Sequence, residues 1–267
     1  MSSLFVSQVQ VHRQAHRSMR KSSIFCSLLV SGTLALPCAF AQDTKVPFPP
    51  AVTLDRHHQS EAPVLTPEMI APGRYRMGTI LIDKADKSVS FPAEINMSKG
   101  LLEYLLVRNG GKTHESLLRT EIDPYSLQIA MLLVGMEGTD GPLLFQGDPN
   151  IPRGESIEVM LRLEANAANP IHPEAWLTQV VGDAKRVVPP LDWVYTGSVV
   201  RNGRFAAQYA GSIVALYHDP VAMVDNASAG GESNRIWFVN EDSTPPVGTP
   251  VKVIIRSKKS DSSRRAM

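Results

Sequence analysis

The stretch LLEYLLVRNGGKTHESLLRT, residues 101–120, decides the fold that we expect. Its first seven residues are almost all apolar, which is typical of a buried strand. The NGGK sequence at 109–112 follows, and its glycines tolerate the positive φ angles of a tight turn between antiparallel strands. Residues 113–120 then return as the partner strand. The stretch therefore predicts a β-hairpin at the centre of the domain.

Short alternating segments on both sides of this hairpin predict further strands, because Gly, Asn, Asp and Pro punctuate them. Pro92 lies inside one segment and indicates a sheet edge or a bulge, since proline lacks the N–H that a strand ladder uses. A polar turn is expected at 84–87. The expected strands cover residues 74–83, 88–95, 156–163, 192–196, 205–209, 212–217, 236–240 and 250–256.

One main helix is predicted near residues 124–134. Asp123 supplies an N-cap, Pro124 suits the first turn, and apolar residues recur at helical spacing up to Gly135. A single helical turn is expected within the loop at 170–178. The predicted class is therefore α+β, mostly antiparallel β in a sheet or sandwich, with one main helix.

The composition is that of a globular protein. Apolar residues make up 43% of the chain and charged residues 20%, which excludes disordered and collagen-like classes. The first 41 residues hold four of the 27 basic residues and none of the 26 acidic ones, so the remaining 226 carry a formal charge of −3. Nucleic-acid binders are usually strongly basic, and that class is excluded. A chain of this length buries about 70% of its unfolded surface, so a core forms without disulfides.

The N-terminal segment has the pattern of a secretory signal peptide. A basic stretch at 13–21 precedes a mostly apolar one at 24–36. A membrane-spanning helix needs about 20 apolar residues, so this stretch is too short. Ala39-Phe40-Ala41 then gives a small-x-small cleavage site. We expect cleavage near Ala41 and a periplasmic or secreted bacterial protein with no transmembrane segment in its mature chain.

Both cysteines, Cys26 and Cys38, lie in this signal, so the mature chain has no disulfide and no thiolate chemistry. Lipidation at Cys38 is disfavoured because Leu36 and Pro37 stand where small residues are needed. Met19 is an alternative start that leaves a compact signal. The mature chain is expected to divide into a Pro-rich linker at 42–72, a domain at 73–257 and a basic, disordered tail at 258–267.

The densest polar group lies in the expected hairpin, at Lys112, His114, Glu115 and Ser116. Histidine exchanges protons near neutral pH, a carboxylate acts as base or metal ligand, and serine can act as a nucleophile. On a regular strand His114 and Ser116 share one face, so a joint site of His114 and Glu115 needs a turn or bulge. The structural alternative is that His114 braces the hairpin through hydrogen bonds while Glu115 is solvated or pairs with Lys112.

A second candidate surface lies at 193–198. Trp193 and Tyr195 share one face of a strand and Ser198 follows in a turn. Aromatic side chains there fit either core packing or a ligand platform. His172 and His218 can join His114 in a metal site only through the fold, and we predict no metal site and no cofactor.

The chain resembles the YdjY domain family of exported bacterial proteins over about residues 91–255. The resemblance rests on GLLEYLLV at 100–107, GKTHESLL at 111–118, WVYTGS at 193–198, YHDP at 217–220, the segment 237–240 and GTPV at 248–251. It implies a role for Lys112, His114, Glu115 and Ser116, but no activity, because the family has none established. Some relatives occur beside ferredoxin-like sequences, which implies a redox setting, although the mature chain has no cysteine to hold a cluster.

We expect a non-catalytic exported module that binds an unknown envelope protein or small ligand through Lys112, His114, Trp193, Tyr195 and Ser198. No complete catalytic signature is present to favour an enzyme. The alternative is a hydrolase or metal-assisted enzyme that uses His114 and Glu115, with Ser116 or Ser198 as nucleophile. A purely structural envelope component is a third possibility.

Overall fold

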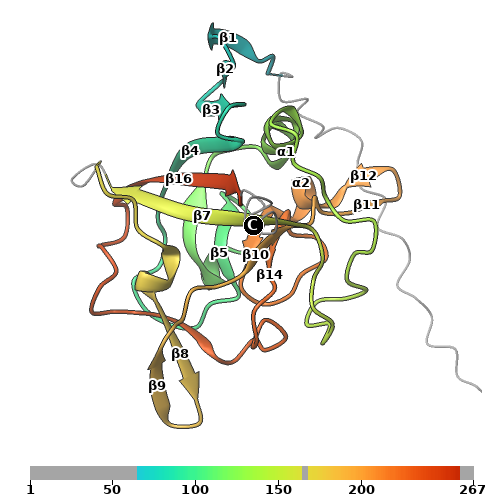
Figure 1. Ribbon diagram of the computed structural model, residues 1–267. Helices are drawn as coiled ribbons and strands as arrows, with labels where there is room; N and C mark the ends of the chain where they lie inside the picture. Colours follow the sequence, from blue (N-terminus) through green and yellow to red (C-terminus); the bar gives the residue numbers. More distant parts are fainter. Residues whose placement is uncertain (1–64, 164–167, 259–267) are drawn as a thin grey trace, which may run out of the picture. The chain divides into compact units, whose positions relative to one another are not determined.

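The computed structural model describes residues 65–163 and 168–258. The expected signal peptide, residues 42–64 of the expected linker and the tail after residue 258 lie outside the described residues. Eight strands close into a barrel, since the first and last strands of the series also pair with each other (Figure 1). In spatial order they are β4 (Ser88–Ile95), β16 (Pro250–Ser257), β7 (Glu155–Leu163), β10 (Trp193–Tyr195), β14 (Val224–Asn226), β13 (Ser212–Ala215), β5 (Tyr104–Arg108) and β6 (Ser116–Thr120).

The mostly β class with one main helix is confirmed, and the sheet is a closed barrel of mixed strands. The helix α1 (Pro124–Leu133) starts where the sequence predicts, with the Asp123 carboxylate accepting a hydrogen bond from the Ser126 N–H at 3.2 Å. Gly135 follows the helix with a φ of 78°, the left-handed conformation that favours glycine. Local sequence signals are sufficient to define this helix.

The predicted hairpin is wrong, because β5 and β6 run parallel. The chain turns at the two glycines, crosses back along β5 and enters β6 beside the start of β5. The Glu103 N–H donates to the Glu115 carbonyl at 2.9 Å, and the Asn109 N–H donates to the Thr120 carbonyl at 2.8 Å. Gly111 lies against the backbone of Gly211, where a Cβ would come within 3.3 Å of its Cα. This close approach packs the crossover against the start of β13.

A short extension leaves the barrel at β4 (Figure 1). β4 pairs with β3 (Ile80–Asp83) up to Ser90 and with β6 from Glu94 onward, and Pro92 lies between. The Pro92 carbonyl accepts a hydrogen bond from the Thr120 hydroxyl. Pro92 has no N–H to donate, and it stands at the point of β4 where neither β3 nor β6 pairs with the strand. The interruption that the sequence indicates at Pro92 is therefore the branch point of the sheet.

The extension continues through β2 (Arg74–Met77) to β1 (Glu68–Ala71). The expected single strand at 74–83 is wrong, because Gly78 turns the chain with a φ of 59° and makes two strands from it. β1 lies within the range expected for the linker and pairs with β2. The described part of the domain thus begins before residue 73.

Smaller elements lie outside the barrel. The helical turn expected near 170–178 is confirmed as η4 (Pro173–Trp176). It leads into a three-stranded sheet of β15 (Trp237–Val239), β8 (Leu177–Val181) and β9 (Ala184–Val187). The expected strand at 205–209 is wrong. β11 (Val200–Arg201) and β12 (Arg204–Phe205) form a hairpin, and the alanine-rich segment after it is the helix α2 (Ala206–Ala210), which Gly211 caps.

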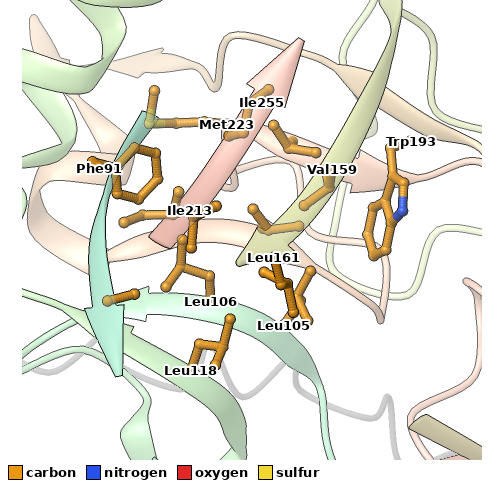
Figure 2. Packing of buried hydrophobic residues seen from close by; sticks show 14 of the residues in the cluster. Phe91, Leu105, Leu106, Leu118, Val159, Leu161, Trp193, Ile213, Met223 and Ile255 are labelled. Atoms are coloured by element: carbon orange, nitrogen blue, oxygen red, sulfur yellow. The ribbon is translucent and has the colours of Figure 1, made fainter. Parts of the chain in front are cut away.

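The core fills the barrel interior (Figure 2). Phe91, Val159, Leu161, Ile213 and Ile255 are each at most 1% exposed. Alternate residues of the long strands β4, β7 and β16 face outward and are partly or fully exposed. None of the described helices has the length and apolar character needed to span a membrane.

Candidate functional site

The crossover between β5 and β6 brings a lysine onto a buried tyrosine. Lys112 Nζ lies 2.6 Å from the Tyr104 hydroxyl and 4.8 Å from the centre of its ring. The Tyr104 hydroxyl donates to Asp219 Oδ2 at 2.7 Å. Tyr104 is fully buried and Asp219 is 4% exposed. The tyrosine hydroxyl therefore links a half-buried ammonium group to a buried carboxylate.

A loop from a distant part of the chain completes this network. Gln146 donates to Glu103 Oε2 at 3.0 Å and to the Tyr104 hydroxyl at 3.2 Å. Its carbonyl oxygen accepts from Lys112 Nζ at 3.3 Å. Asn234 donates to the other oxygen of Glu103 at 3.3 Å. Three separate loops thus meet over the start of β5, and we call these residues, with Glu115, the Lys112 network.

Burial shifts the pKa of two groups in the network. Burial and then the Glu103 charge raise the pKa of Glu115, and the neighbouring Lys112 and His114 oppose the rise only in part. Burial, followed by the charge of Asp219, raises the pKa of Tyr104 above its usual range. Tyr104 therefore stays protonated and serves as a donor to Asp219.

A layer of buried polar groups lies behind the network. Asp225 is fully buried, and burial raises its pKa to about 8. Its two oxygens accept the N–H groups of Asp219 and Asn226 at 3.0 and 2.8 Å. His218 places Nδ1 2.7 Å from the Asp148 carbonyl and Nε2 2.9 Å from the Asn226 carbonyl. The His218 ring therefore bridges two backbone carbonyl groups from different parts of the chain.

The match to a known protein family includes all the residues of the Lys112 network. The YdjY domain matches residues 80–256, from β3 to β16, and includes every member of the Lys112 network. The chain belongs to the YdjY domain family. Neither a curated protein nor a solved structure matches it. Family membership therefore confirms the resemblance without supplying an activity.

In this YdjY domain, the turn at 112–115 keeps three candidate residues together. Residues 113–115 form the short 3-10 helix η2, which supplies the turn that a joint His-Glu site needs. His114 exposes 78% of its side chain and places Nε2 3.7 Å from Glu115 Oε2. Lys112 Nζ lies 3.9 Å from Glu115 Oε1. Ser116 is fully buried and its hydroxyl donates to the Leu118 carbonyl at 2.8 Å.

The other three candidate residues of the YdjY domain have partners elsewhere. Trp193 and Tyr195 are buried, and they donate to Glu174 at 3.3 Å and to Gln128 at 2.8 Å. Ser198 donates to the Val221 carbonyl at 2.6 Å. None of the three forms a hydrogen bond with the Lys112 network among the described residues. The fold therefore separates the two surfaces that the sequence analysis considered together.

Histidine and carboxylate side chains of this YdjY domain are the groups that could bind a metal ion. Within residues 65–163 and 168–258, no three His, Cys, Asp or Glu side chains are placed to hold a metal ion. His218 uses both ring nitrogens on backbone carbonyls.

Sequence reasoning missed several members of the network, namely Glu103, Tyr104, Gln146 and Asn234. Tyr104 stands in a segment that carries the family resemblance, and a lone tyrosine in an apolar strand is a usable signal because its hydroxyl needs a partner when buried. Gln146 and Asn234 lie in polar loops and give no such signal.

Proposed function

We propose that this protein is an exported, non-catalytic binding module that recognises an envelope protein or a small ligand. Its binding surface, which we call the recognition face, comprises the turn at 112–115 and the loop at 144–151. The carrying observation is that Leu144, Phe145 and Ile151 expose 78%, 56% and 69% of their surface on one short loop. Large apolar side chains gathered on a surface are typical of interaction sites.

The loop is held in one conformation by polar anchors, which supports this proposal. The Gly147 N–H donates to the His218 carbonyl at 2.8 Å, and the ring of His218 bonds to the Asp148 carbonyl. The Leu144 N–H donates to Asp148 Oδ2 at 3.0 Å, and Gln146 bonds to Glu103 and Tyr104. A loop fixed before binding loses little conformational entropy when a partner docks, which favours affinity.

The polar side of the recognition face supplies specificity. Lys112 and Glu115 lie within 3.9 Å of each other at its margin, and His114 is exposed beside them. A partner that places an apolar group over Phe145 can form charged hydrogen bonds with this margin. The face therefore offers an apolar contact with a charged rim, as binding surfaces in general do.

Site-specific crosslinking tests the proposal in the cells that produce the protein. A photoreactive residue at Phe145 should give one discrete crosslinked product. The same residue at Val187 on β9, which is 92% exposed and apolar, is the matched control and should give none. The Lys112→Ala change should weaken the product at Phe145. Equal crosslinking at both positions, or none at either, would contradict the proposal.

The alternative is a hydrolase that uses His114 and Glu115, and the raised pKa of Glu115 favours it, since a protonated carboxyl is a general acid. Both candidate nucleophiles are engaged, because Ser116 bonds to Leu118 and Ser198 bonds to Val221. Turnover of a generic ester, peptide or phosphate substrate that is lost in His114→Ala and in Glu115→Gln would establish this alternative and overturn the binding module.

Export is part of the proposal and rests on the N-terminal sequence. The basic stretch, the short apolar stretch and the Ala39-Phe40-Ala41 site support cleavage after Ala41. N-terminal sequencing of the protein recovered outside the cytoplasm should begin at Gln42. Recovery of the intact N-terminus in the cytoplasm alone would contradict export.

A further inference from the structure

A hollow of about 420 Å³ lies on the outer wall of the barrel, beside the extension β1–β3. Its lining includes the outward-facing residues Ser90 on β4, Lys252 and Arg256 on β16, and Arg162 on β7. The extension adds Arg74 and Asp83. This hollow is separate from the recognition face, since the two share no lining residue.

The basic residues of the hollow differ in how they are neutralised. Arg256 lies opposite Glu158 in the strand register and pairs with it at 2.6 Å. Arg74 lies opposite Asp83 and pairs with it at 3.1 Å. In both cases a carboxylate stands directly across the ladder from the cation. These two pairs are neutral and leave no charge to a ligand.

Lys252 and Arg162 break this pattern, because they lie directly opposite each other on β16 and β7. Two like charges at opposed positions on one face destabilise a sheet. Among the described residues, neither forms an ion pair with a carboxylate. The hollow therefore concentrates two uncompensated positive charges on adjacent strands.

Arg162 supplies a second, independent observation. Its Nε is buried and has no hydrogen-bond acceptor among the residues that the structure describes. A buried donor without a partner costs about 1–3 kcal/mol, so such groups are rare in folded proteins, and a bound water or ion is one way in which they are satisfied. Arg162 and Lys252 also line a neighbouring hollow of about 230 Å³. Open space therefore adjoins both cations.

We propose that this hollow is a binding site for a small oxyanion-bearing ligand, whose phosphate, sulfate or carboxylate group lies between Arg162 and Lys252. The guanidinium group presents a planar pair of donors that matches two anion oxygens, and the ammonium group adds a point charge. The anion offsets the repulsion between the two cations. Ser90 adds a hydroxyl, while Ile254 and Met160 give an apolar floor.

The ligand is small and carries few charges. Asp86 also lines the hollow, and its carboxylate opposes a polyanion or an anionic membrane surface. A volume of about 420 Å³ lies within the range of roughly 300–1,000 Å³ that small-molecule sites occupy. The site thus selects a compact molecule with one oxyanion group.

Calorimetric titration of the full chain with inorganic phosphate, sulfate and acetate tests the site, with chloride at matched ionic strength as the reference. At least one oxyanion should bind with one-to-one stoichiometry, and comparison of the three identifies which group is preferred. Lys252→Gln should weaken that binding at least tenfold. Arg186→Gln, on the exposed strand β9, removes a positive charge outside the hollow and should bind as the parent chain does.

Thermal unfolding gives a second readout that does not depend on the ligand. Lys252→Gln should raise the melting temperature in chloride, because it removes a repulsive pair, and Arg186→Gln should not. Absence of binding by all three anions, or equal affinity in Lys252→Gln and the parent chain, would overturn the proposal. Lys252 is exposed, so the variant folds even where Arg162→Gln does not.

Discussion

Asp225 should make the protein lose stability as the pH rises. Its carboxyl group is fully buried beneath the Lys112 network, and burial raises its pKa to about 8. An aspartate in an unfolded chain titrates near pH 4. Between these two values the folded protein holds a proton that the unfolded chain has released. Deprotonation therefore favours the unfolded state throughout that interval.

The magnitude follows from linkage. One proton held only in the folded state gives a slope of about 1.4 kcal/mol per pH unit. Between pH 5 and pH 7, Asp225 should reduce the free energy of unfolding by about 3 kcal/mol, and the loss should level off above pH 8. Below pH 4 both states are protonated, so the contribution of Asp225 there is complete and constant. The direction is the reverse of that for an aspartate in a surface salt bridge.

Asp225→Asn isolates this effect, because the amide has the same shape and no charge. Its oxygen can keep one of the two backbone hydrogen bonds, and its NH₂ group loses the other, so the variant should be about 1 kcal/mol less stable at pH 5. Urea unfolding at pH 5, 6, 7 and 8 should show the two chains crossing in stability as the pH rises. Parallel curves for the two chains would refute the argument that Asp225 is protonated in the folded protein.

Three further predictions concern the network, the loop and the core. Tyr104→Phe removes the hydroxyl that Asp219 accepts from, and should lower the free energy of urea unfolding by about 1–3 kcal/mol; a loss under about 0.5 kcal/mol would contradict the network. Gly147→Ala should speed hydrogen exchange across residues 144–150, because the added Cβ would collide with the Tyr217 hydroxyl. Unchanged exchange would show the loop to be loosely held. Leu161→Ala, inside the barrel, should cost about 2–5 kcal/mol in the same urea assay, whereas the outward-facing Met160→Ala should cost less.

Local signals account for the elements that the sequence predicts well. The helix at 124–133 has a cap, a first-turn proline and a terminal glycine, and strands β4 and β16 alternate over eight residues each. The two glycines at 110–111 show that the chain turns, but not whether the following strand returns antiparallel or crosses back in parallel. That choice depends on Gly211, about 100 residues later, whose backbone contacts the crossover.

The candidate site also contains some residues that the sequence singles out and others that only the fold brings together. Lys112, His114 and Glu115 are adjacent in the chain, so the sequence alone could single them out. Asp219 is 115 residues from Tyr104, and they meet because β13 pairs with β5. The alternation of Trp193 and Tyr195 fits either core packing or a ligand platform, and the structure shows core packing, because both side chains are buried.

The buried polar layer explains why the recognition face is rigid. Burying a polar group costs free energy unless its hydrogen bonds are formed inside the protein. A core that served stability alone would therefore have apolar side chains in place of Asp219, Asp225 and His218. Here each of them bonds to backbone or to Tyr104, and His218 reaches the backbone of the loop at 144–151. Apolar side chains cannot form hydrogen bonds with the backbone carbonyl groups of a loop. The layer therefore stabilises one loop conformation at a cost to the barrel.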